Sequence, residues 1–352
     1  MTRLYKRVAR PTNHAPYIFT RLVRPDPTVV FDSFWRFASE RQNIFHLRLQ
    51  GATPPWTADS ILGEYRFTNA YRASDRVSQF LIRNVIYAGD QDPLEVLFRT
   101  LLFKLFNKIE TWELLASTLG WPQASDFSVA RYERILSSAS ARGQRLYSSA
   151  YIMPPPSTFG ASRKHHNHLL LLERMLADDL ANRLADTASM TAAYNLLRSY
   201  PSLGPFLAYQ FIIDLNYGPV LSFSEMDFVV PGPGARDGLR KCFSSFGDFS
   251  ECDLIRLVAD TQHDEFSSRA LPFRSLWGRP LQLVDCQNLF CEIDKYARVA
   301  HPDFSGITAR HRIKQRYSPG LDLPVPWYPP KWEINDKIPE SLALQAASSG
   351  GS

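Results

Sequence analysis

The sequence predicts an all-α protein with a substantial core. Apolar residues recur at intervals of three and four along most of the 352 residues, whereas the alternation typical of half-buried strands is scarce. Hydrophobic residues make up 45% of the chain and aromatic residues 13%, which is enough apolar material for a large core. No segment repeats at a fixed period, so a solenoid is not predicted.

The first ninety residues contain three predicted helices. The first spans 31–50 and stops before a glycine, as a helix often does. Thr57 is expected to cap a second helix over 59–67, and Ser74 or Asp75 is expected to begin a third.

The clearest helix follows Asp92. This aspartate suits the N-cap, Pro93 suits the first helical position, and leucines form one stripe behind them. Further helices are predicted over 110–120, over 129–139, after the basic cluster 163–166, in two pieces over 190–218 with a break at 200–204, and over 281–300.

Composition divides the chain into three parts. Residues 1–30 form a basic arm, residues 31–318 the helical domain, and residues 319–352 a proline-rich arm followed by a disordered tail. The basic start lacks the apolar stretch of a secretory signal, and no stretch has the length of a membrane span. An intracellular protein without membrane contact is expected, nuclear in a eukaryote and cytoplasmic in a phage-infected or bacterial cell.

The net charge and the cysteine spacing indicate which kinds of partner and ligand the sequence predicts. The formal net charge of +5 is compatible with a polyanion such as DNA or RNA. The four cysteines are too irregularly spaced for a disulfide framework, a zinc site or an iron–sulfur cluster. The Walker A motif of ordinary ATP-using kinases is absent. We therefore predict no metal and no cofactor.

The most informative segment begins at Tyr200. A short turn before a helix exposes backbone N–H groups that can bind a phosphate, and an aspartate beyond it can stabilise developing positive charge. This pattern resembles the helix-hairpin-helix motif and catalytic loop of the endonuclease-III-like DNA glycosylases, which implies a two-lobed fold. In that reading Asp227 is the catalytic residue, Ala208 fills a small position, and the DNA-binding hairpin consists of Pro201, Ser202, Leu203 and Gly204.

Three positions depart from the glycosylase pattern. Phe206 stands where bifunctional members carry a Schiff-base lysine, which argues against a lyase. Ser202 replaces the first hairpin glycine, and Phe228 and Val229 follow the aspartate in place of threonine and histidine. These differences weaken the match to base excision itself.

A second set of catalytic candidates comes earlier in the chain. Asn69, Arg72 and Asp75 bring an amide, a guanidinium and a carboxylate together beside aromatic residues, a combination suited to holding an extruded base. Structural ion pairing is the alternative explanation.

Other polar residues are candidates for DNA contact or for a cleft. Gly232 and Gly234 could form a backbone nest for phosphate or a tight turn before a helix, and Arg163, Lys164 and Arg279 could contact phosphates or belong to ordinary charged loops. The residues expected to line a cleft, with a solvent-facing helix as the alternative, are Glu225, Asp285, Gln287 and Lys295.

A closer resemblance covers most of the chain. The segments 54–87, 98–113, 227–243 and 276–302 resemble the helical domain associated with phage 5-hydroxymethyluracil (5-hmdU) DNA kinases, a domain grouped with the α-glutamyl/putrescinyl thymine pyrophosphorylases. The resemblance implies substitution at the 5-methylene carbon of a flipped, modified thymine in duplex DNA, beside a kinase or another base-modifying enzyme. A monofunctional DNA glycosylase and a non-catalytic DNA-binding module are the alternatives.

Overall fold

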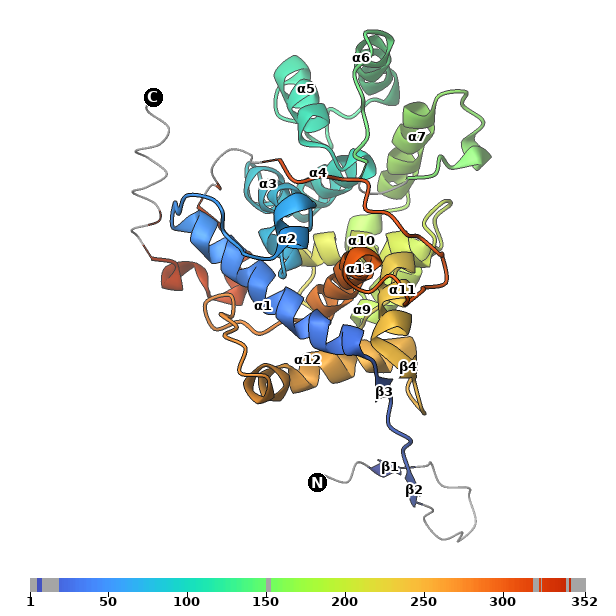
Figure 1. Ribbon diagram of the computed structural model, residues 1–352. Helices are drawn as coiled ribbons and strands as arrows, with labels where there is room; N and C mark the ends of the chain where they lie inside the picture. Colours follow the sequence, from blue (N-terminus) through green and yellow to red (C-terminus); the bar gives the residue numbers. More distant parts are fainter. Residues whose placement is uncertain are drawn as a thin grey trace, which may run out of the picture.

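The computed structural model describes residues 5–7, 19–149, 153–318, 323, 325–339 and 342. Within them, thirteen α-helices carry the fold (Figure 1). The strands form two short antiparallel pairs, β1 (Tyr5–Arg7) with β2 (Phe19–Arg21), and β3 (Asp26–Pro27) with β4 (Phe243–Ser245). The all-α prediction is confirmed.

The helices pack in two groups (Figure 1). The first group holds α1 (Val29–Leu49), α2 (Ser60–Glu64), α11 (Pro233–Cys242), α12 (Glu251–Ser268) and α13 (Leu283–Ala300). The second holds α4 (Pro93–Phe106), α5 (Ile109–Leu119), α6 (Val129–Ala141), α7 (Lys164–Ala177) and α8 (Leu180–Ala185). Between them α10 (Pro205–Tyr217) packs on α4 and on α9 (Met190–Arg198).

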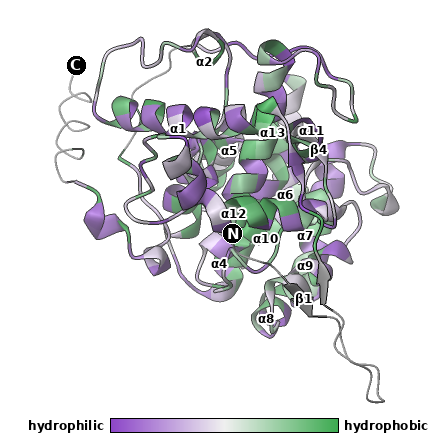
Figure 2. Cartoon of the chain, turned by 60° about the horizontal axis from the view of Figure 1, so that its bottom comes forward, coloured by the Kyte–Doolittle hydropathy of each residue, from purple (hydrophilic) through white to green (hydrophobic). Residues whose placement is uncertain are grey.

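Helix α1 is set by its cap and its amphipathic pattern. Thr28 Oγ1 accepts the N–H of Val30 at 3.1 Å, and Gly51 follows the helix with a φ of +67°. Figure 2 shows hydrophilic and hydrophobic residues alternating along its turns, as expected of a helix with one buried face. The predicted first helix is confirmed.

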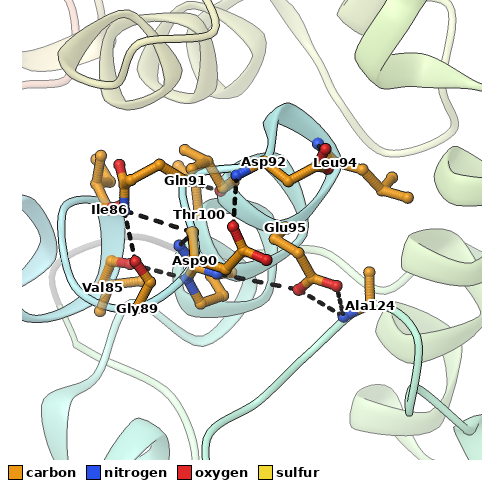
Figure 3. A network of polar contacts seen from close by, with 12 residues as sticks. Val85, Ile86, Gly89, Asp90, Gln91, Asp92, Leu94, Glu95, Thr100 and Ala124 are labelled. Atoms are coloured by element: carbon orange, nitrogen blue, oxygen red, sulfur yellow. Dashed lines mark hydrogen bonds and ion pairs between the residues drawn. The ribbon is translucent and has the colours of Figure 1, made fainter.

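The start of α4 is fixed by a network of polar contacts (Figure 3). Asp92 Oδ1 accepts the N–H of Leu94 at 2.9 Å, with Pro93 in the first turn, as predicted. Both carboxylate oxygens of Glu95 accept the backbone N–H of Ala124, at 3.1 and 2.9 Å. These contacts fix the position of α4. The same helix carries Lys104, whose side chain is buried.

One predicted cap is wrong, and one helix that begins after Asp75 as predicted differs further along. Helix α2 is capped by Asp59, whose Oδ1 accepts N–H groups at 2.8 and 3.0 Å, while Thr57 accepts only the N–H of Asp59. The third predicted helix divides into the α-helix α3 (Arg76–Leu81) and the π-helix η2 (Ile82–Ile86). Asp75 precedes α3 without a side-chain capping bond, because its carboxylate accepts the N–H of Asn69 instead.

Helices α11 and α13 lie in close contact. A Cβ added to Gly238 would stand 1.9 Å from the carbonyl oxygen of Phe290, so only glycine allows the two backbones to approach this closely. Nearby, the ammonium of Lys241 pairs with the buried carboxylate of Asp294 at 2.9 Å. The position of α13, which contributes to the candidate site, therefore depends on α11.

Both chain ends are described only in part. Much of the predicted basic arm and most of the predicted disordered tail lie outside the described residues. Of the proline-rich arm, the segment 325–339 packs on the body, where Tyr328 is fully buried. Among the described helices, none has both the length and the apolar character that a membrane crossing requires.

Candidate functional site

A buried carboxylate on α10 lies between two cations. Asp214 is 2.6 Å from a guanidinium nitrogen of Arg72 and 2.6 Å from the ammonium of Lys104. Burial alone would raise the pKa of Asp214, but the two cations hold it below its usual value. Burial lowers the pKa of Lys104 to about 8, although Asp214 opposes the shift. The carboxylate thus compensates two positive charges at once.

Arg72 joins this ion pair to the neighbouring elements. It lies in the 3-10 turn η1 (Arg72–Ser74), and its guanidinium donates to Tyr217 at 2.8 Å and to Gln210 at 3.2 Å. Gln210, Asp214 and Tyr217 follow one another at spacings of four and three, so they share one face of α10. The helical periodicity therefore places three partners of the Arg72 guanidinium on one face of the helix.

Asp285 extends the network to α13. Its Oδ1 accepts the backbone N–H of Arg72 at 2.8 Å, and its Oδ2 accepts that of Gln282 at 3.0 Å, which caps the helix. Burial, followed by the charge of Glu225, raises the pKa of Asp285 to about 7.

Glu225 provides a third buried acid. One of its oxygens, Oε2, pairs with Arg279 at 3.1 Å, whereas Oε1 has no hydrogen-bond partner among the described residues. The hydroxyl of Tyr209 on α10 is likewise buried without a partner in that part of the chain. Burial raises the pKa of Glu225 and that of Tyr209. We call Arg72, Lys104, Asp214, Glu225, Arg279 and Asp285, with the polar side chains on α10, the polar centre.

The raised pKa of Asp285 predicts a pH dependence of stability. Between its ordinary value of 3.8 and about 7, the folded state binds the proton more tightly than the unfolded state, so this carboxyl stabilises the fold less as pH rises. Asp285→Asn is expected to remove this contribution, which amounts to at most about 1.4 kcal/mol per pH unit. Urea unfolding at pH 4, 5.5 and 7 measures it.

The control for this experiment is the exposed Asp303→Asn, which should keep the wild-type slope. Equal slopes for the wild type and Asp285→Asn would contradict the prediction.

Asn69 and Asp75 form hydrogen bonds within the loop that carries Arg72. The side chain of Asn69 accepts from Arg41 at 2.7 Å and donates to the carbonyl of Ser74 at 2.7 Å. Burial raises the pKa of Asp75 to about 6, although the hydrogen bond from the backbone N–H of Asn69 opposes this shift. The structure therefore joins Asn69, Arg72 and Asp75 through the loop, whereas Arg72 pairs with Asp214.

The predicted cleft residues separate into different environments. Glu225 and Asp285 belong to the polar centre, and Lys295 pairs with the buried Glu292, which accepts the backbone N–H of Thr68 at 3.1 Å. Gln287 is buried elsewhere on α13, donating to Cys291 at 3.2 Å. The face of α13 expected to be in solvent or in a cleft therefore packs on the segment before Arg72.

Asp227 lies on the surface, two residues beyond Glu225. Its backbone N–H donates to Ser224 at 3.1 Å, and its carbonyl accepts from Arg256 at 3.1 Å. Its side chain is exposed on the loop between α10 and α11. The loop thus buries the carboxylate of Glu225 and exposes that of Asp227.

The predicted hairpin joins α9 to α10. Ser202, at the first glycine position of the motif, has a φ of +66°, the conformation that glycine adopts most easily. Gly204 precedes α10 and Gly232 precedes α11, each followed by a proline. A Cβ on Gly232 would come within 2.5 Å of the Phe206 ring, so the two helix starts lie side by side. Gly234 packs against Cys291 in the first turn of α11.

Arg163 and Lys164 lie at the start of α7, on other helices than the polar centre. Arg163 pairs with Glu133 at 3.2 Å, and the ammonium of Lys164 lies 4.1 Å from the centre of the Tyr147 ring. Both border a pocket of 470 Å³ between α6 and α7, which Arg145 also lines. Their phosphate-binding role stays a prediction.

The cysteines form no disulfide. Cys242, Cys252, Cys286 and Cys291 are all free, and two of them are buried. Among the described residues, no group of three or more histidine, cysteine or acidic side chains is arranged to hold a metal.

Comparison with known proteins gives the family. Residues 28–306 match the family model described as the helical domain of 5-hmdU DNA kinase. The chain belongs to this family. It is 27% identical over 323 residues to the 5-hmdU DNA kinase of Bacillus phage SP10, in a match that covers 84% of this chain and 50% of that protein. No solved structure matches.

The 5-hmdU kinase helical domain contains the whole polar centre, since all six of its charged residues fall within 28–306. Lys104 and Asp214 were not predicted from the sequence. The signal was present, because each is a lone charge among apolar neighbours on a helix, LLFKLF and FIIDL, and a buried charge requires a partner. The segment 325–339, which packs beside the centre, lies beyond the match.

Proposed function

We propose that this chain acts on DNA in the hypermodification of thymine, on a base of the 5-hydroxymethyluracil type that is flipped out of the duplex. The observation that carries the proposal is the coincidence of the family match with a polar centre that holds three buried acids and two arginines. Such groups suit the hydrogen-bonding edge of a pyrimidine.

DNA contact is proposed at the adjacent starts of α10 and α11. Their backbone N–H groups point out of the helices, and the helix dipoles favour a phosphate at this end. Pro201, Leu203 and Gly204 bring the duplex to the loop that carries Asp227 and Glu225. Arg163 and Lys164 are proposed to add sequence-independent attraction, whereas Arg279, which pairs with Glu225, belongs to the polar centre.

The proposed reaction is a substitution at the 5-methylene carbon. The bond from this carbon to an oxygen leaving group breaks, and the oxygen departs with the electron pair. A bond to an incoming nucleophile forms, and the nucleophile gives its proton to a carboxylate. Asp227 is the proposed acceptor, because its exposed side chain lies on the DNA-facing loop.

A kinase is the proposed neighbour. The chain spans 50% of the phage relative whose printed name is 5-hmdU DNA kinase. We infer that this chain works next to a module that phosphorylates the base, which would supply the oxygen leaving group. An intracellular location goes with a DNA partner and stays part of the proposal.

The test is product analysis with purified protein. Wild type, Asp227→Asn, Glu225→Gln and the control Asp303→Asn are incubated with DNA containing thymine, 5-hydroxymethyluracil or its pyrophosphorylated form, with an amine as nucleophile. Nucleosides and free bases are then analysed by mass spectrometry. A mass shift is expected with wild type and control, and a rate at least about 100-fold lower with Asp227→Asn.

The alternatives give different products. Free base without a modified nucleoside would establish a glycosylase instead. DNA binding with no product from any substrate would establish a non-catalytic module. A rate unchanged by Asp227→Asn would remove this residue from the reaction.

A further inference from the structure

We propose that Trp332 occupies the subsite for a flipped base, and that the turn 330–333, within the segment 325–338, must withdraw from the polar centre when DNA binds. This inference rests on the proposed function and names the place where the base would lie. The family match does not include the segment, although Tyr217, Glu225 and Arg279, which surround the subsite, lie inside the match.

Trp332 is held as a stacked base would be. The guanidinium carbon of Arg279 lies 3.9 Å from the centre of the indole, a cation–π contact. Tyr328 stacks on the same indole at 5.9 Å with an interplanar angle of 19°, and Tyr217 meets it edge-on at 5.7 Å. An arginine plane and aromatic rings are the surfaces on which proteins stack nucleobases.

Two hydrogen-bonding groups of the polar centre have no partner among the described residues. Arg279 is also the partner of Glu225, whose Oε1 is buried and unbonded within the described residues, as is the hydroxyl of Tyr209. Buried polar atoms without partners cost free energy unless a ligand satisfies them. An indole offers one N–H donor and no acceptor, whereas a pyrimidine offers both donors and acceptors.

The ammonium of Lys331 also attaches the segment to the body of the protein. It donates to the carbonyls of Gly218 at 3.0 Å and of Leu221 at 2.6 Å, on the loop that leads to Glu225. Burial lowers the pKa of Lys331 to about 8, while the charge of Glu225 opposes the shift. Lys331 thus places its positive charge close to the acid that the base would meet.

The attachment of the segment is suited to release. Among the described residues, its backbone–backbone hydrogen bonds stay within the segment, and it is tied to the body by side chains, such as Gln79 to the N–H of Trp327 at 2.8 Å. Glu333, directly after the indole, has a φ of +52°, a conformation that costs a non-glycine residue free energy. Tyr328 is fully buried and can remain as the anchor while the turn at 330–333 moves.

The test measures the affinity of the full chain for two DNA duplexes. One carries a single 5-hydroxymethyluracil, and the other has an abasic analogue at the same place. Trp332→Ala is expected to bind the first duplex about 10-fold more tightly than wild type, because the competitor for the subsite is gone. No gain is expected for the abasic duplex, or for the matched control Trp121→Ala, a distant tryptophan that is 39% exposed.

A second measurement does not depend on that variant. Hydrogen–deuterium exchange of wild type should show faster exchange in peptides from 325–338 when the 5-hydroxymethyluracil duplex is added, and Lys331→Ala should show the faster exchange without DNA. Slower exchange on adding DNA, weaker or unchanged binding by Trp332→Ala, or an equal gain for both duplexes would overturn the inference. Failure of every protein to bind DNA would overturn the proposed function as well, so the two failures are distinguishable.

Discussion

Asp214→Ala is expected to lower the free energy of unfolding by about 3–5 kcal/mol, because it removes a buried carboxylate that pairs with two buried cations. The carboxylate is 2.6 Å from both Arg72 and Lys104, and the exposed fractions of the three side chains are 3%, 7% and 1%. Both cations are therefore shielded from water in the folded state. Urea unfolding followed by circular dichroism measures the loss.

Two further variants make the result specific. Asp178→Ala breaks a surface ion pair of similar length, 2.8 Å to Arg174, whose side chain is 63% exposed, and should cost less than about 1 kcal/mol. Adding Lys104→Met to Asp214→Ala should recover part of the stability, since one of the two buried charges that Asp214 compensates is removed. Equal losses for Asp214→Ala and Asp178→Ala would mean that Asp214 is not the counterion of the polar centre.

The helices could be predicted where local signals agree. Asp92 and Pro93 mark the start of α4 through a cap and a fixed φ, and the turn 200–204 separates α9 from α10 as its proline and glycine indicate. The cap of α2 could not be predicted with certainty, because Thr57 and Asp59 are both residues that suit an N-cap, and the structure uses Asp59. The π-helix η2 could not be predicted, because its register is set by tertiary packing.

The polar centre could be predicted only as separate residues. Arg72, Glu225, Arg279 and Asp285 each stood out by type and neighbours, but their proximity depends on contacts between residues more than fifty positions apart. Trp332 could not be predicted as part of a site, because a tryptophan beside a proline-rich segment has no periodic pattern to place it.

Gly238→Ala is expected to destabilise the fold by about 3 kcal/mol or more, because a methyl group cannot fit where α11 meets α13. The added Cβ would lie 1.9 Å from the carbonyl oxygen of Phe290 and 2.8 Å from its carbonyl carbon. Both are backbone atoms of a helix, so no side-chain rotation relieves the overlap. The gain of about 1 kcal/mol in helix propensity is smaller than this cost.

The matched control is Gly63→Ala, which also lies in a helix but has nothing within 4 Å of the added Cβ. It should unfold at the wild-type urea concentration or slightly above, whereas Gly238→Ala should unfold well below it. Because α13 carries Asp285, Gly238→Ala should also disturb the contact of this acid with Arg72 and lower any activity of the folded fraction. Stability equal to that of Gly63→Ala would mean that α11 and α13 can separate freely, and the close contact would then not be what positions Asp285.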